Sequence, residues 1–332
     1  MEFGSLSDAA RESAATVIRA CLKVKGGERL TIVADQGGEE VAKDIWTFCA
    51  GEGLEPALVL PGGWAPGADE PPAVLAGFMA VSDVVICVTP RPVAHTRARR
   101  EACERGARVA ILPGVTRDGF ESEAMRTDYG YVSRLAAHLA GLLTRAQRVS
   151  VVTGDSHLEM TVVGRKGYAD TGVIDLRGRA GVLPGGEAFV APLEGTAEGE
   201  IVVDGSIPGR VLETPLLLKF RSGRLVSAEG EAAGEFTGIL EGIPEARTLA
   251  ELGIGCNPGA AIRGAPPEDE KVLGSVHVAL GTNSTFGGLV WAGAHVDAVI
   301  RSPDLYLDDL LVVSGGRFVN DPGESEVGEE YA

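Results

Sequence analysis

The chain has 332 residues, of which 45% are hydrophobic, and its formal net charge is -17. This length and composition are typical of a globular protein with two domains. The acidic balance excludes the basic surface that nucleic acids require and disfavours anionic membranes. No run of about 18 apolar residues and no signal-peptide pattern is present, so we expect a cytoplasmic protein that binds a small molecule.

Several common site motifs are absent from the sequence. The five cysteines form no C-x-x-C pair and their number is odd, which argues against a zinc ribbon or a disulfide framework. Neither G-x-G-x-x-G nor G-x-x-x-x-G-K-[ST] occurs, so nucleotide binding has no motif to support it.

The first half of the chain alternates between helical and extended patterns. Apolar residues at helical spacing predict a helix over 8–23, with Ser7 as its N-cap. The remaining pattern predicts strands over 28–35, 55–62, 83–90 and 107–114, and helices over 39–53, 71–82, 95–106 and 127–147. Strands that alternate with helices predict an α/β N-terminal domain with a parallel sheet, which we place at residues 1–147.

From residue 148 the pattern changes to short strands separated by glycine-rich turns. The segment 213–230 is typical of a hairpin with Ser222 and Gly223 near its turn, and one helix is predicted over 234–245. Residues 148–332 are therefore expected to form a mixed α+β domain that bears the chemistry.

His277, His295 and Asp297 are the first candidates for metal ligands. His295 and Asp297 lie two residues apart on a predicted strand, so their side chains share one face of it. An imidazole and a carboxylate that point into one volume can hold a divalent metal. The alternative is a plain histidine–aspartate hydrogen bond on a strand surface.

Glu187 and Glu251 extend this set. Each lies among apolar and small residues, where a carboxylate is costly unless it is paired or bound to a cation. Together with the two histidines and Asp297 they make a ligand set large enough for two metal ions, which stabilise both the attacking and the departing group in hydrolysis. Each glutamate could instead be a surface residue of a half-buried strand.

Five segments, at 183–192, 199–209, 249–258, 273–281 and 295–300, resemble the metallo-aminopeptidase family of the aminopeptidase T and aminopeptidase S type, in the family's order. The resemblance implies an α/β domain, a metal-bearing C-terminal domain and a homodimer. It also implies that Glu187, Glu251, His277, His295 and Asp297 bind a pair of divalent metals. The family's catalytic tyrosine is replaced here by Ser284, and the spacing of 18 residues from His277 to His295 is narrower than in the family.

The chain also resembles 2,5-dihydroxypyridine 5,6-dioxygenase, a ring-cleaving enzyme of the same superfamily. That resemblance implies one iron(II) ion bound by His277, His295 and Asp297, with open positions for oxygen and substrate. It further implies a histidine of the N-terminal domain near the substrate, for which His95 is the candidate. His95 follows a predicted strand at the carboxyl edge of the parallel sheet, where ligand clefts of such sheets lie.

Three functions remain open at this point. The first is an aminopeptidase-type hydrolase of peptides or small amides, with zinc, cobalt or manganese as one or two ions and Glu187 or Glu251 accepting the proton of the attacking water. The second is the mononuclear iron(II) dioxygenase with His95 near its substrate. The third is a binding protein that has lost turnover, which the replacement by Ser284 makes conceivable.

Overall fold

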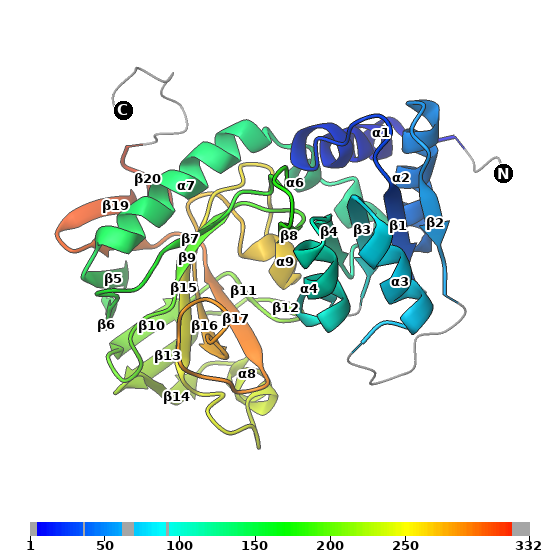
Figure 1. The fold of residues 1–332 in the computed structure, drawn as a ribbon. Helices are drawn as coiled ribbons and strands as arrows, with labels where there is room; N and C mark the ends of the chain where they lie inside the picture. Colours follow the sequence, from blue (N-terminus) through cyan, green and yellow to red (C-terminus); the bar gives the residue numbers. More distant parts are fainter. Residues whose placement is uncertain (1–4, 36, 62–69, 91–92, 321–332) are drawn as a thin grey trace. The chain divides into compact units, whose positions relative to one another are not determined.

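The protein is described by a computed structural model for residues 5–35, 37–61, 70–90 and 93–320 (Figure 1). Its helices are α1 (Asp8–Ala15), the π-helix η1 (Thr16–Cys21), α2 (Glu39–Gly51), α3 (Ala73–Val81), the 3-10 helix η2 (Val93–His95), α4 (Arg97–Glu104), α5 (Arg117–Phe120), α6 (Glu123–Arg126), α7 (Tyr129–Arg145), α8 (Ala233–Ile239) and α9 (Pro266–Asp269). The chain divides into two compact units: unit 1 holds residues 1–129 and 172–185, and unit 2 holds residues 130–171 and 186–332.

This division differs from the predicted boundary at residue 147 in two places. Residues 130–147 lie in unit 2, because Leu135, Leu139 and Leu143 of α7 belong to the core of that unit. Residues 172–185 return to unit 1, where they add a strand to its sheet. Local sequence patterns indicate neither of these two assignments, because both depend on contacts between distant segments.

Unit 1 is built on a parallel sheet with the strand order β2-β1-β3-β4-β8. The strands are β1 (Leu30–Ala34), β2 (Ala57–Val59), β3 (Val84–Thr89), β4 (Arg108–Pro113) and β8 (Ala180–Val182), and every neighbouring pair is parallel. The chain moves from β1 to β2 in one direction and then to β3 and β4 in the other. Right-handed crossovers therefore place α2 on one face and α3 and α4 on the other.

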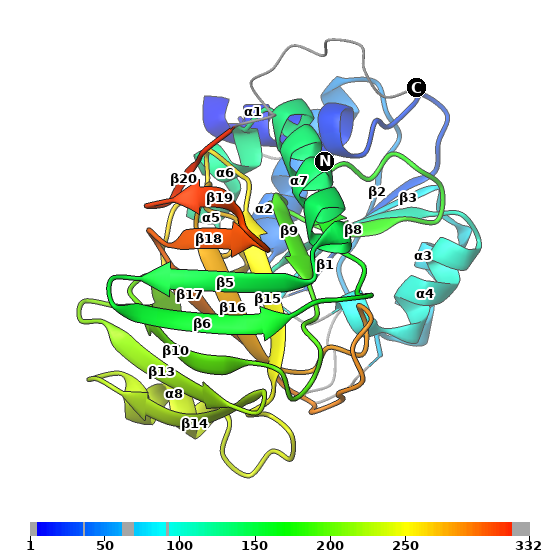
Figure 2. The same cartoon turned by 90° about the vertical axis from the view of Figure 1, so that its left-hand side faces the viewer.

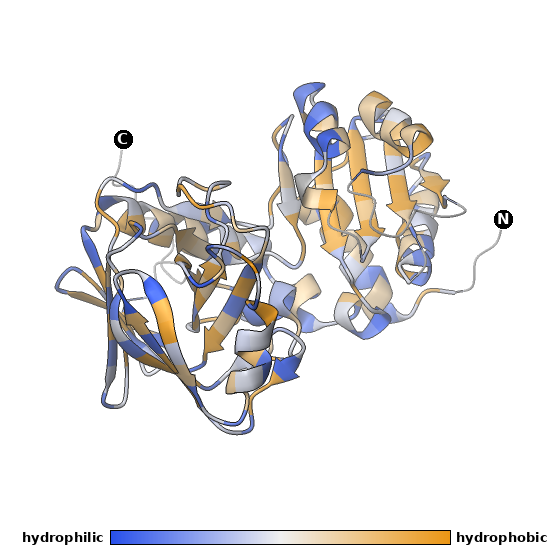
Figure 3. Ribbon diagram, turned by 90° about the horizontal axis from the view of Figure 1, so that it is seen from below, coloured by the Kyte–Doolittle hydropathy of each residue, from blue (hydrophilic) through white to orange (hydrophobic). Residues whose placement is uncertain are grey.

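The central strands of this sheet are buried along their whole length. All five residues of β1 and all six of β3 are buried, as expected for strands covered on both faces. Figure 3 shows these strands as continuous hydrophobic ribbons between helices of mixed character. At the start of the chain, Ser7 caps α1 as predicted, since its hydroxyl accepts a hydrogen bond from the amide of Ala10.

Unit 2 contains two antiparallel sheets (Figure 2). The eight-stranded sheet has the order β14-β13-β10-β6-β5-β18-β19-β20, and the seven-stranded sheet has the order β12-β11-β17-β16-β15-β9-β7. Their strands are β5 (Arg148–Thr153), β6 (Ser156–Thr161), β7 (Tyr168–Asp170), β9 (Glu187–Val190), β10 (Glu198–Val203), β11 (Ser206–Ile207), β12 (Arg210–Val211), β13 (Leu216–Arg221), β14 (Arg224–Glu229), β15 (Leu249–Gly255), β16 (Val276–Gly281), β17 (His295–Ile300), β18 (Asp304–Leu307), β19 (Leu310–Ser314) and β20 (Arg317–Phe318). The predicted fold class, a parallel α/β part and a mixed α+β part, is confirmed.

One hydrophobic core joins both sheets of unit 2 with α7, and it includes Leu158, Ile201, Leu252 and Val278. The predicted hairpin is β13–β14, and both turn residues, Ser222 and Gly223, have positive φ as a two-residue hairpin turn requires. The predicted helix over 234–245 is shorter than expected and ends at Ile239. Within the described part of the chain, every helix is too short or too polar to cross a membrane.

Candidate metal centre

The five predicted ligands come together on one face of the seven-stranded sheet. Across the ladder of β15, β16 and β17, Glu251 lies opposite Ala279, and Ala279 lies opposite Asp297. His295 pairs with Gly281 one step along the same face, because side chains at i and i+2 share a face. Ala279, which lies between Glu251 and Asp297, has a small side chain and leaves the space above β16 open for the ligand side chains.

Two glycines of β15 keep this space open near His277. Gly253 lies opposite His277, and a β-carbon on Gly253 would come 2.0 Å from Cε1 and 2.1 Å from Nε2 of the imidazole. Gly255 lies opposite Glu187 of β9, and a β-carbon there would meet the backbone carbonyl oxygen of Val272 at 1.9 Å. The imidazole and a neighbouring loop therefore lie directly over the strand at positions where only glycine fits.

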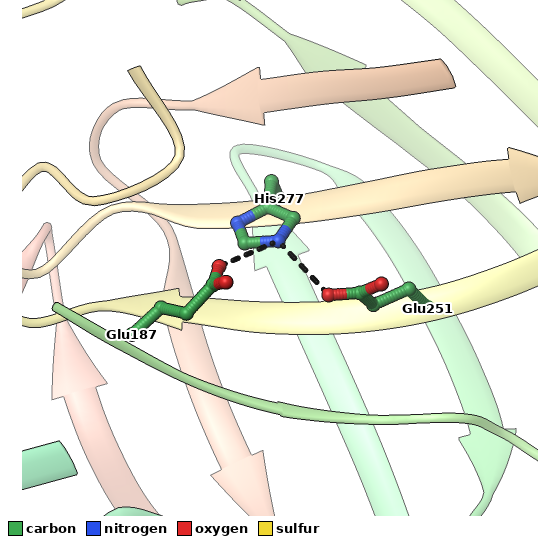
Figure 4. Close-up of side chains that lie close together, drawn as sticks. All are labelled: Glu187, Glu251 and His277. Carbon is green, nitrogen blue, oxygen red and sulfur yellow. Dashed lines mark ion pairs between the residues drawn. The ribbon is translucent and has the colours of Figure 1, made fainter. Parts of the chain in front are cut away.

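His277 is the centre of the first group of ligand atoms (Figure 4). Its Nε2 lies 3.4 Å from Oε2 of Glu187 and 3.5 Å from Oε1 of Glu251. One ligand atom from each of these three residues can be chosen so that all lie within 4.8 Å of one another, and the same holds for Glu270, His277 and Asp297. The separations of 3.4 and 3.5 Å from Nε2 of His277 suit donors that surround a common cation at the usual distance of about 2 Å.

His295 lies at the open end of the group. Its Nε2 is 3.3 Å from Oε2 of Glu251 and 3.4 Å from Oδ1 of Asp297. Its Nδ1 is 2.9 Å from the carbonyl oxygen of Thr282, to which it donates in the neutral tautomer. This hydrogen bond leaves the lone pair of Nε2 free toward the two carboxylates, which is the arrangement that metal-binding histidines adopt. The His295 side chain is 35% exposed, whereas His277 is fully buried.

Several polar atoms of this centre are buried without a hydrogen-bond partner. Among the described residues, Oε2 of Glu187, Oδ1 of Asp297 and both ring nitrogens of His277 are buried and make no hydrogen bond. Buried polar atoms are normally hydrogen-bonded, and buried charges are paired or coordinate metals. The donor set therefore fits a divalent cation, which would satisfy these atoms together.

The pKa values of Glu251 and His277 are shifted because carboxylates and imidazoles lie close together in this centre. Burial alone would raise the pKa of Glu251, but the two neighbouring histidines lower it to about 2. Burial would likewise lower the pKa of His277, but the carboxylates around it raise it to about 9. The arrangement thus favours positive charge beside Glu251, whether it is carried by a proton or by a metal ion.

A family model described as 2,5-dihydroxypyridine 5,6-dioxygenase (NicX) matches residues 68–320. The chain belongs to the 2,5-dihydroxypyridine 5,6-dioxygenase family. The predicted resemblance to that family is therefore confirmed, and the ligand candidates in unit 2 all lie inside the matched region. No curated protein matches the chain by sequence.

Two solved structures extend the comparison to the fold. The 2,5-dihydroxypyridine dioxygenase of Pseudomonas putida KT2440 matches with a TM-score of 0.78 and 18% identity, over 97% of this chain and 100% of that one. Wild-type AmpT from Thermus thermophilus matches with a TM-score of 0.69 and 17% identity, over 94% of this chain and 99% of that one. This chain therefore shares its fold with both solved structures.

Sequence reasoning did not predict that Lys271, Asp170 and Glu270 lie beside the ligand candidates. The ammonium of Lys271 donates to Oε1 of Glu187 at 2.6 Å and to Oε1 of Glu270 at 2.8 Å, and it lies 3.7 Å from Oδ2 of Asp170. Burial would lower the pKa of Lys271, but these carboxylates raise it well above its ordinary value, so the ammonium is charged. The only hint in the sequence is the acidic run at 268–270, just before the segment of His277.

Aromatic rings flank the open end of the centre. Phe189 shares a face of β9 with Glu187 and stacks on Tyr168 at 5.6 Å between ring centroids. Phe286 meets Phe189 edge-on at 5.4 Å and meets the imidazole of His295 edge-on at 6.0 Å. The loop that carries Phe286 is held by Glu194, which accepts hydrogen bonds from the side chain of Asn283 at 2.9 Å and the amide of Leu289 at 2.8 Å.

His95 and Ser284 complete the predicted residues. The backbone of His95 ends the 3-10 helix η2 in unit 1, but its side chain lies outside the described residues, so its role stays a prediction. At the carboxyl edge of the unit 1 sheet there is a cavity of about 180 Å³, lined by loops that follow β1, β3 and β4. Ser284 is exposed in the loop between β16 and β17, and its amide donates to the carbonyl oxygen of Val290.

Proposed function

We propose that the chain is a mononuclear iron(II) dioxygenase that cleaves a hydroxylated nitrogen-containing aromatic ring of the 2,5-dihydroxypyridine class. The observation that supports this most is the approach of His277, His295 and Asp297 on one sheet face, with buried donor atoms that no hydrogen bond satisfies. Two histidines and one carboxylate with open positions are the ligand set of non-haem iron(II) oxygenases. Membership of the dioxygenase family supports the same reaction.

The residues of the chain then have separate tasks. Ferrous iron held by His277, His295 and Asp297 would supply the activation of dioxygen, which no side chain can perform. The carbonyl oxygen of Thr282 fixes the tautomer and the orientation of His295 through its 2.9 Å contact with Nδ1. The burial of His277 beneath the ligand group keeps that end of the centre dry, whereas the partial exposure of His295 marks the side from which substrate enters.

Glu251 is the candidate residue for orienting a hydroxyl group of the substrate. Its two carboxylate oxygens lie 3.5 Å from Nε2 of His277 and 3.3 Å from Nε2 of His295, so it borders both ligand histidines. The neighbouring histidines hold its pKa at about 2, so the carboxylate is ionised at neutral pH and can accept a hydrogen bond from a ring hydroxyl. Glu187 and His95 are the other predicted catalytic groups, and Glu187 accepts a hydrogen bond from the ammonium of Lys271 at 2.6 Å.

The aromatic rings beside the centre support a planar substrate. Phe286 and Phe189 present an edge-to-face pair next to His295, and both rings are only partly buried. Aromatic rings prefer offset or edge-to-face contacts with other rings, so this wall favours a flat heterocycle over a peptide backbone.

A metal-dependent hydrolase remains the second candidate, and one observation favours it. Glu251 directs one oxygen toward His277 and the other toward His295, so its carboxylate could serve as a ligand beside either histidine. In that case the five predicted ligands would hold two divalent metals, which would supply Lewis-acid activation of a scissile carbonyl and of water. The fold shared with AmpT agrees with this candidate but does not separate it from the first.

Oxygen uptake tests the proposal directly. Protein freed of metal and reloaded with iron(II) under nitrogen is expected to consume dioxygen when 2,5-dihydroxypyridine is added, in proportion to the iron bound. The His295→Ala and Asp297→Ala variants should bind no iron and consume none. Release of nitroaniline from leucine nitroanilide by the zinc- or cobalt-loaded protein, without oxygen uptake by the iron form, would overturn the dioxygenase and support the hydrolase.

A further inference from the structure

Lys271 lies at a position of the centre where a free cation could otherwise bind. Its side chain is only 2% exposed, and its ammonium is within 4 Å of carboxylate oxygens from Asp170, Glu187 and Glu270. Three carboxylates around one buried point are the hard oxygen donors that divalent metals prefer. The ammonium therefore occupies a ready-made cation site.

Backbone contacts fix the chain position of Lys271 beside β15. The carbonyl oxygen of Lys271 accepts a hydrogen bond from the amide of Asn257 at 2.8 Å, directly after β15. A β-carbon on Gly255 would come 2.8 Å from the carbonyl carbon of Lys271, so the segment crosses β15 only because that residue is glycine. The lysine thus enters the centre from a fixed position.

Glu187 connects the ammonium to the metal ligands. Its Oε1 accepts the hydrogen bond of Lys271 at 2.6 Å, and its Oε2 lies 3.4 Å from Nε2 of His277. The carboxylate therefore separates two cation positions, one occupied by Lys271 and one beside the histidines. Glu251 borders the second position, where His277, His295 and Asp297 also point.

We propose that Lys271 is a built-in cation that takes the place of a second divalent metal and restricts the centre to one metal ion. The inference rests on the proposed function for the first metal at His277, His295 and Asp297. The ammonium repels a divalent ion and uses the carboxylate lone pairs that such an ion would need. Without it, Asp170, Glu187 and Glu270 would carry buried negative charge that demands another cation.

Metal stoichiometry tests this inference independently of turnover. Metal-free wild-type protein, Lys271→Met and Lys271→Arg are titrated with manganese(II) by calorimetry, and the bound ions are examined by electron paramagnetic resonance. We expect one ion per chain in the wild type and in Lys271→Arg, which keeps the positive charge. Lys271→Met is expected to bind two ions, with the spin-coupled spectrum of a close pair.

A matched control separates a local effect from a general loss of charge. Lys219 also lies near two carboxylates, Glu200 at 3.9 Å and Glu229 at 2.8 Å, but at the surface of unit 2. Lys219→Met should therefore still bind one ion. Lys271→Gln, which is neutral and can still donate hydrogen bonds, replaces Lys271→Met if circular dichroism shows that the latter is unfolded, and it should also bind two ions.

The outcomes distinguish this inference from the proposed function. Two ions in the wild type, or one ion in the folded neutral variant, would overturn the role of Lys271. One ion in the wild type and two in the variant, without oxygen uptake by the iron-loaded wild type, would support the role of Lys271 and contradict the dioxygenase. Failure of every variant to bind manganese would contradict both.

Discussion

Gly253 lies directly opposite His277 in the β15–β16 ladder, and the imidazole occupies the volume that a side chain at residue 253 would fill. The ring is therefore placed over the neighbouring strand, where its Nε2 reaches both Glu187 and Glu251. A cross-strand glycine thus decides the position of a ligand that belongs to a different strand.

The Gly253→Ala variant should lose metal affinity. The added β-carbon would lie about 2 Å from the ring, so the imidazole must move away from its partners. We expect the dissociation constant to rise by about 10- to 100-fold, the usual cost of disturbing the support of a metal ligand. Calorimetric titration measures this, with Gly234→Ala as the control because nothing lies within 4 Å of a β-carbon there. Equal affinity in both variants would contradict the placement of His277.

Removal of the metal should destabilise the protein. Without a cation, the donor atoms of Glu187, His277 and Asp297 stay buried and unsatisfied. Metal at about 100 times its dissociation constant adds about 2.7 kcal/mol to the free energy of unfolding, which corresponds to a Tm shift of about 5 to 10 °C. Calorimetric scans with and without chelator measure the shift. The Asp297→Ala variant should show none, and a chelator-insensitive wild type would argue against a bound metal.

Phe286→Ala should weaken substrate binding without affecting the metal. The ring lies edge-on to His295 at 6.0 Å between centroids, so it can contact a substrate ring but ligates nothing. Loss of one aromatic contact costs about 0.5 to 1.5 kcal/mol, so KM should rise by up to about tenfold while metal stoichiometry stays the same. Steady-state oxygen uptake provides KM and kcat. Leu289→Ala, an exposed change in the same loop, is the control, and an equal rise in both variants would refute a specific contact.

Asp83 should make stability depend on pH in the acid range. Arg29 donates to both carboxylate oxygens of Asp83, at 2.9 and 3.0 Å, and lowers the pKa of Asp83 to about 2. The ordinary aspartate pKa is about 3.9, so the contribution is complete above that pH and is lost as pH falls through about 2. The Tm difference between wild type and Asp83→Asn should therefore be constant near neutral pH and shrink below about pH 4. A difference that does not change with acid would contradict the pairing, and Asp118→Asn is the surface control.

The periodic patterns of the sequence were sufficient for the fold class. Hydrophobic runs such as those of β1 and β3 identify buried parallel strands wherever they occur, because a strand covered on both faces has no polar side. The same local reasoning placed His295 and Asp297 on one face, since alternation along a strand is independent of its neighbours. Ser7 was identified as a cap for a similar reason, because capping involves only the next few residues.

Two features depend on contacts between distant segments, and only the tertiary structure decided them. The return of residues 172–185 to the sheet of unit 1 requires β8 to pair with β4, and three residues of strand carry too little pattern to predict that. The ammonium of Lys271 meets Asp170 and Glu187 only because antiparallel pairing of β7 and β9 aligns those two carboxylates. Charge is a property of each residue, but the compensation of a buried charge depends on which strands become neighbours, and that is settled when the whole sheet packs.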